Sequence, residues 1–195
     1  MEIKALLGIF AGLLSFFAYL LYIYSSIWGK TRPNRVTWGV LTLVGIMIAS
    51  SYYAGGARNT IWIALAYIAG PFVTFLISLK HGEGGTSRFD LFCLAGVVAS
   101  LVLWFSTGSA MIALLINILI DALGFLPTVK KSYLRPKGED RKAWLLESIA
   151  SALNLTAIER WTFAIWIYPI YLLVVNSLIT LLLFQKRKRR VNLLL

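Results

Sequence analysis

Cysteine and histidine are almost absent from this sequence, which has one of each, Cys93 and His81, among 195 residues. One thiol cannot form a disulfide, and one thiol with one imidazole gives too few ligands for a zinc site. The sequence also lacks a glycine-rich phosphate fingerprint, a paired-carboxylate motif and a nucleophile elbow. We therefore expect no cofactor, no metal and no enzymatic activity. An intramembrane enzyme would need two apposed reactive groups, which only Asp121 and Glu147 could supply.

Charged residues are scarce as well. They make up 14% of the chain, against 59% hydrophobic residues, and the mean hydropathy is +0.78. A soluble domain carries about a quarter charged residues, so a soluble globule is excluded. Bases outnumber acids by 19 to 8, but they form short clusters between apolar runs rather than one basic face. This pattern marks membrane boundaries, so we expect a lipid bilayer as partner and no nucleic acid.

Charge-poor runs predict an all-α, polytopic membrane protein with seven transmembrane helices. The run from 91 to 129 has Asp121 as its only charged residue and is about twice as long as one membrane crossing needs. The small polar residues 106–109 therefore predict a turn within it. The first run is too long for a signal peptide and no Ala-x-Ala site follows it. The sixth run is short and carries Glu147. The predicted spans are 5–29, 36–57, 59–79, 91–105, 110–129, 143–158 and 161–185.

The distribution of bases predicts the orientation. With seven spans, sixteen of the nineteen bases fall on one side, and only Lys4, Arg58 and Arg160 fall on the other. Loops rich in Lys and Arg stay in the cytoplasm, so the N-terminus is expected outside and the C-terminus inside. Trp38 and Trp144 flank predicted inner loops, as in an interfacial tryptophan belt. The basic run 186–190 follows a span directly, which favours a membrane anchor over a nucleic-acid patch.

Two halves of the chain have arginine, proline and tryptophan residues at similar positions. Arg32-Pro33 precedes Trp38 between the first and second spans, and Arg135-Pro136 precedes Trp144 between the fifth and sixth. The third and seventh spans each contain one proline, Pro71 and Pro169. With one helix between them, the halves have the same topology, which predicts a parallel repeat of two three-helix bundles. The expected division is 1–80 and 108–185 for the bundles, 89–107 for the linker helix and 186–195 for a cytoplasmic tail.

This 3+1+3 plan resembles the SWEET and PQ-loop superfamily of membrane transporters. The family motif, Pro-Gln followed by bases, has an altered counterpart at the inner end of the fifth span, in the segment 124–133: Pro127 is present, and Thr128 stands where Gln would. The first half has Tyr24 where the motif has proline. The resemblance implies that Pro127 acts as a hinge. It also implies that Asn176, with Ser78 at the equivalent position, contacts substrate.

Polar residues within the spans are the other candidate site residues. Asn117, Asp121, Gly124 and Thr128 form one stripe of the fifth helix. A carboxyl group in hydrocarbon is costly, so Asp121 is expected to face the bundle interior. It is either a proton or cation site in a transport path or a structural hydrogen-bond acceptor. Asn176 is either a substrate contact or an interhelical hydrogen-bonding residue.

Glu147 lies five residues after Lys142 and is either a second proton-coupling group or a side chain that snorkels to water. Pro71 and Pro169 each free one carbonyl and permit a bend, so they are hinges or tolerated kinks.

We expect a transporter of a small polar solute, such as a sugar, that works by alternating access. Coupling of this transport to protons stays open. The alternative is a receptor, sorting or structural protein of the same fold. A homo-oligomer and a monomer both stay open.

Overall fold

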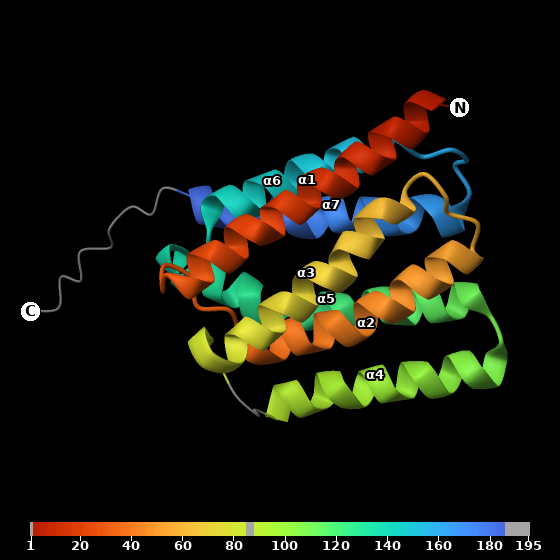
Figure 1. The fold of residues 1–195 in the computed structure, drawn as a ribbon. Helices are drawn as coiled ribbons and strands as arrows, with labels where there is room; N and C mark the ends of the chain where they lie inside the picture. Colours follow the sequence, from red (N-terminus) through yellow and green to blue (C-terminus); the bar gives the residue numbers. More distant parts are fainter. Residues whose placement is uncertain (1, 85–87, 186–195) are drawn as a thin grey trace, which may run out of the picture.

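The computed structural model describes residues 2–84 and 88–185, with the side chains of part of α4 left out. The predicted basic tail, 186–195, lies outside the described residues. The expected all-α architecture is confirmed for the described part of the chain (Figure 1). Its helices are α1 (Glu2–Ile27), α2 (Arg35–Ala54), α3 (Ile61–His81), α4 (Arg88–Thr107), α5 (Ala110–Leu134), the 3-10 helix η1 (Pro136–Gly138), α6 (Arg141–Thr156) and α7 (Phe163–Phe184).

Five of these helices, α1, α2, α3, α5 and α7, are long and apolar enough to cross a membrane. Such helices indicate an integral membrane protein. The helix α6 has 16 residues, about 24 Å at 1.5 Å per residue, and is shorter than a hydrocarbon core of about 30 Å.

Helix boundaries follow local chemistry. Asn34 precedes α2, and its side chain accepts hydrogen bonds from the backbone of Val36 and Thr37. Asp140 caps α6 in the same way. Such side chains satisfy amide groups that a helix start leaves without partners. The turn predicted at 106–109 is confirmed: α4 ends at Thr107, and Gly108 has a φ of +63°, a left-handed conformation that glycine adopts without strain.

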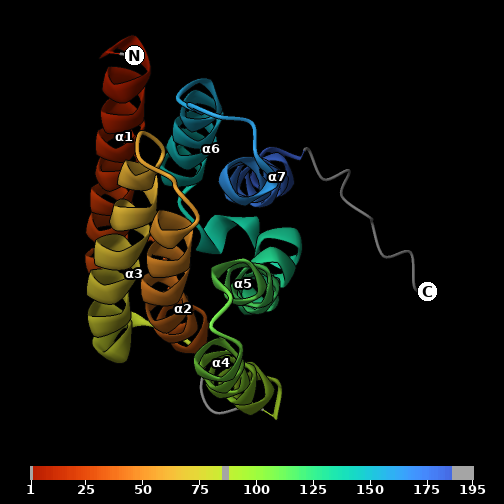
Figure 2. The same cartoon turned by 90° about the vertical axis from the view of Figure 1, so that its right-hand side faces the viewer.

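The helices form two trios that face each other (Figure 2). The front trio consists of α1, α2 and α3, and its α3 packs against both α1 and α2. The rear trio consists of α5, α6 and α7, and its α7 packs against both α5 and α6. Across the boundary, α1 packs against α6, and α2 packs against α5. The helix α4 lies at one edge, against α5 and α2. The boundary between the trios is therefore lined by all six helices other than α4.

Small residues let the front trio pack closely. A Cβ atom on Gly12 would lie 2.7 Å from the Cβ of Trp62, so α1 can approach α3 only with glycine there. A Cβ on Gly70 would collide with the ring of Tyr19. Close helix contacts through small residues are typical of membrane helices. Gly70 also fixes where the Tyr19 ring lies, at the boundary between the trios.

Apolar side chains cover much of the outside of the molecule, and polar ones are buried within it. Large exposed residues include Phe10, Phe17, Val102 and Leu181. A lipid environment accounts for this distribution, since hydrocarbon solvates apolar side chains and penalises polar ones. The predicted inward orientation of Asp121 is confirmed, and other polar residues of the helices are buried as well: Asn117, Thr128, Glu147, Ser151, Asn154, Asn176 and Thr180.

Candidate functional site

A small internal cavity lies between the trios, with walls made mainly of rings. The front trio contributes Tyr19 and Tyr22 from α1, Trp38 from α2 and Tyr67 from α3; the rear trio contributes Phe125 from α5 and Trp144 from α6. We call these six rings the aromatic cage. Glu147, Ala18 and Ala143 complete the lining. The cavity has a volume of about 10 Å³, which is room for about one water molecule.

Glu147 is the ionisable carboxyl group of this cavity. It is only 5% exposed, and the Ser15 hydroxyl on α1 lies 2.9 Å from each of its two carboxylate oxygens. The Tyr67 hydroxyl also interacts with this carboxylate. Glu147 therefore does not snorkel to water: of the two positions left open by the sequence, the buried one is correct. It joins α6 of the rear trio to α1 and α3 of the front trio.

Asn176 extends this network into α7. Its amide nitrogen donates to the Tyr67 hydroxyl at 2.6 Å and contacts the Ser151 hydroxyl at 2.9 Å. Because Tyr67 accepts from Asn176, its own proton is available for Glu147. Among the described residues, the Asn176 side-chain oxygen and both polar atoms of Asn154 are buried without a hydrogen-bond partner. Buried amides in this state are suited to binding water or a polar ligand.

Asp121 occupies a separate position on α5. It is 3% exposed, and Tyr171 on α7 donates a hydrogen bond of 2.7 Å to it. The Tyr171 ring stacks on Tyr168, at 6.3 Å between centroids. Asp121 is thus held by α7 of its own trio, whereas Glu147 is held by the front trio.

Ser78 does not share a contact with Asn176, its equivalent in the repeat. Its hydroxyl donates to the carbonyl of Phe75, and its own carbonyl accepts from Arg35. It lies three residues before the end of α3, where the chain enters the loop. The structure therefore places Ser78 in a helix end rather than in the central network, because that end needs acceptors for the Arg35 side chain.

Each predicted hinge proline lies inside a helix: Pro71 in α3, Pro127 in α5 and Pro169 in α7. Pro71 and Pro169 are buried and Pro127 is half-buried. Their movement is not tested by one conformation, so the hinge role stays a prediction.

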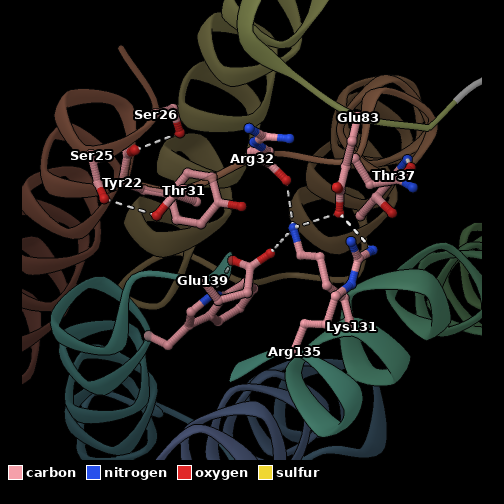
Figure 3. Close-up of polar contacts among 12 residues, drawn as sticks. Tyr22, Ser25, Ser26, Thr31, Arg32, Thr37, Glu83, Lys131, Arg135 and Glu139 are labelled. Carbon is pink, nitrogen blue, oxygen red and sulfur yellow. Dashed lines mark hydrogen bonds and ion pairs between the residues drawn. The ribbon is translucent and has the colours of Figure 1, made fainter. Parts of the chain in front are cut away.

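An ion-pair cluster closes one end of the boundary between the trios (Figure 3). Lys131 on α5 is 6% exposed and pairs with Glu139, whose side chain is fully buried. The Lys131 ammonium also donates to the Arg32 carbonyl and lies 3.8 Å from Glu83, which pairs with Arg135 at 3.3 Å. We call these residues the loop-end cluster. They join the α1–α2, α3–α4 and α5–α6 connections.

Glu139 links the loop-end cluster to the aromatic cage. One carboxylate oxygen pairs with Lys131, and the other accepts a hydrogen bond of 3.0 Å from the indole of Trp144. Glu139 also lines an open vestibule of about 490 Å³, whose wall includes Lys30, Lys137 and Arg141. Glu139 therefore both lines the vestibule and contacts a ring of the cage.

Sequence reasoning missed the cage and the cluster. Trp38 and Trp144 were expected in an interfacial belt, but they are 2% and 3% exposed and face the interior. Lys131 was counted as a loop base and is buried. A signal for Lys131 was present, because it lies three residues after Thr128 and continues the polar stripe of α5.

The described residues include no cluster of three His, Cys, Asp or Glu that could hold a metal ion. In comparisons with family models, with curated proteins and with solved structures, nothing matches this chain. The functional argument therefore depends on the geometry of the site.

Proposed function

We propose that this protein is a multi-pass transporter of a small polar solute that works by alternating access. The observation that carries the proposal is the position of Glu147: a buried carboxyl group of the rear trio that lines a cavity between the trios and is held by side chains of the front trio. A merely structural helix contact needs no cavity beside it. Intramembrane ionisable residues that face such spaces commonly mark solute or proton pathways.

The proposed architecture is a 3+1+3 arrangement of seven spans, with α4 as the linker. The packing supports it: if α1, α2 and α3 are matched with α5, α6 and α7, the contact between α1 and α6 becomes the contact between α5 and α2. The contacts of α3 with its two neighbours become those of α7 in the same way. This correspondence is expected of a parallel repeat. It also supports a distant relationship to the SWEET and PQ-loop superfamily.

We propose an outer N-terminus and a cytoplasmic C-terminus. The loop-end cluster and the vestibule lie at the base-rich end, which positive-inside bias assigns to the cytoplasm. Lys4 and Arg58 lie at the opposite end, where Lys4 donates to the carbonyl of Ile158 and the Arg58 amide donates to Glu159.

In this scheme the structure corresponds to a closed state. The loop-end cluster seals the cytoplasmic side, and the cavity holds about one water. Rocking of the trios would break the contacts of Lys131 with the Arg32 carbonyl and with Glu83 and enlarge the cavity, with Pro71, Pro127 and Pro169 as hinges. Asn176, Asn117 and Asp121 are the proposed solute contacts, and Asp121 and Glu147 are the groups that exchange protons.

Transport by purified protein in liposomes tests the proposal. We expect exchange of a labelled polar solute from a panel of sugars, amino acids and amines, and a drop of at least tenfold in Glu147→Gln and Asn176→Ala. Ser50→Ala is the matched control, because Ser50 is exposed on α2 and bonds only within its helix, to the Ile46 carbonyl. Flux that is unchanged in both site variants would refute the role of these residues.

A receptor of the same fold is the second candidate, favoured by the open vestibule. Its wall carries four bases and two acids at one end of the molecule: Lys30, Lys137, Arg141, Lys142, Glu139 and Asp140. Saturable binding at this vestibule without flux of any solute would favour the receptor.

A further inference from the structure

The aromatic cage is made of side chains that attract a positively charged ligand. Its rings form a continuous series of contacts. Centroids of Tyr67 and Tyr19 lie 5.5 Å apart, those of Tyr19 and Trp38 6.0 Å, and those of Trp38 and Tyr22 4.9 Å. The series continues from Tyr22 through Trp144 to Phe125, with 6.1 Å at each step. Aromatic faces are negative and attract cations, Trp most strongly.

The formal charge on the cavity wall is negative. Glu147 is the one ionisable acid or base in the lining, and its partners, Ser15 and Tyr67, are neutral hydroxyls. Ion pairs found in the described part of the chain all involve the loop-end cluster, so no Lys or Arg there pairs with Glu147. A buried carboxylate without a cationic partner is costly. A cationic ligand would provide that partner.

An anion or a sugar fits this cavity less well. An anion would meet a carboxylate in a wall that otherwise consists of rings and two alanines. A sugar needs many hydrogen-bonding groups, but the Trp144 indole is engaged with Glu139, and the Tyr67 hydroxyl is engaged with Asn176. Among the described residues, the wall has two further buried polar atoms without a hydrogen-bond partner, the Tyr22 hydroxyl and the Trp38 indole nitrogen, which are few for the hydroxyls of a sugar.

We infer that the aromatic cage binds the ammonium group of a small organic cation, with Glu147 as its counter-charge. The inference deepens the proposed function, on which it rests for the movement of the ligand. In the closed state the cavity holds about one water, so the rings separate when the cation binds. Ala18 and Ala143 are the two small residues of the lining, so once the rings separate they obstruct methyl groups on the nitrogen least.

The vestibule wall carries four bases and two acids, so Glu139 and Asp140 are the groups of this wall that attract a cation. Glu139 faces both the vestibule and the cage, and it is paired with Lys131 when the site is closed. An arriving ammonium group can replace the Lys131 ammonium at this carboxylate before it reaches Glu147. The path thus presents two carboxylates in series.

Equilibrium binding of tritiated choline to the detergent-purified full chain tests the inference. Tetramethylammonium should compete with choline, whereas 3,3-dimethylbutan-1-ol, its neutral isostere, should compete at least tenfold less well. Glu147→Gln should weaken choline binding at least tenfold. Tyr19→Phe keeps the ring and should bind within threefold of the parent, whereas Tyr19→Leu should lose at least tenfold. Ser50→Ala is the unaffected control.

Equal competition by the neutral isostere, or parental affinity in Glu147→Gln, would overturn the inference. If Glu147→Gln does not fold, the pair Tyr19→Phe and Tyr19→Leu decides, and equal affinity of the two also overturns it. Choline binding without flux in liposomes would refute transport and leave the cation site standing. Flux of a neutral solute with no choline binding would refute the cation site and leave transport standing.

Discussion

The front and rear trios share a packing plan and differ in the chemistry that they bring to their boundary. In both, the third helix lies between the other two. The front trio supplies Tyr19, Trp38 and Tyr67 to the cage, whereas the rear trio supplies the carboxyl groups, Asp121 and Glu147. The residues at the boundary therefore differ between two trios that pack alike. The candidate site therefore needs both halves, since the front trio supplies four of its six rings and the rear trio supplies the other two rings and the carboxyl group of Glu147.

Removing the buried ion pair of the rear trio should have the largest effect. Lys131→Met leaves Glu139 buried without its cation, and loss of one partner of a buried pair costs about 3–5 kcal/mol. The free energy of unfolding, measured by SDS titration in mixed micelles, should fall by that amount. Lys130→Met, at the adjacent exposed position, is the control. The double variant Lys131→Met, Glu139→Gln should regain much of the loss. Equal stability of the two single Lys variants would contradict the pairing.

Removing one hydroxyl donor from each carboxyl group compares the two acidic positions. Tyr171→Phe takes the donor from Asp121, and Ser15→Ala takes one from Glu147. Hydrogen bonds to charged groups contribute about 1.5–3 kcal/mol. Tyr171→Phe should be the more destabilising in the same titration, because Glu147 keeps its interaction with Tyr67. The exposed Tyr53→Phe serves as the reference. A larger loss in Ser15→Ala would show that the two sites have been ranked wrongly.

The two equivalent helix caps should have equal and smaller effects. Asn34→Ala and Asp140→Ala each remove a side-chain acceptor at the start of α2 or α6, worth about 1 kcal/mol. Asn34→Gly and Asp140→Gly should cost only a few tenths of a kcal/mol. Thermal unfolding followed by circular dichroism checks all four. Effects that differ by more than about 1 kcal/mol between the trios would argue against equivalent roles in the repeat.

The smallest effect is expected at the edge of the loop-end cluster. The Arg135 side chain is 70% exposed, so its pair with Glu83 is screened by water. Arg135→Ala should cost less than about 1 kcal/mol, and the difference should shrink in high salt. Unfolding titrations at low and high ionic strength measure both. A loss as large as that of Lys131→Met would mean that Glu83, and not Glu139, is the main partner of the cluster.

Much of the fold follows from one-dimensional patterns. Charge-poor runs predict the long helices, and the small polar residues at 106–109 predict the turn between α4 and α5. Helical spacing predicts that Asn117, Asp121 and Thr128 share a buried face, because hydrocarbon excludes them from the outside.

The aromatic cage could not be predicted in this way. A tryptophan near a span end suits the headgroup region and the protein interior equally well in sequence terms, and only the packing of α2 against α5 and of α1 against α6 decides for Trp38 and Trp144. Lys131 is similar, since its burial depends on Glu139, a residue of a loop whose path the sequence pattern does not specify.

Glu139 has a mechanical consequence. Because its two oxygens hold different partners, a single rotation of this side chain releases an ammonium group and an indole together. In the proposed transport cycle, loss of the ion pair beside the vestibule would therefore also free the Trp144 ring in the wall of the cavity. Opening of the base-rich end and enlargement of the cavity would then be coupled through one side chain.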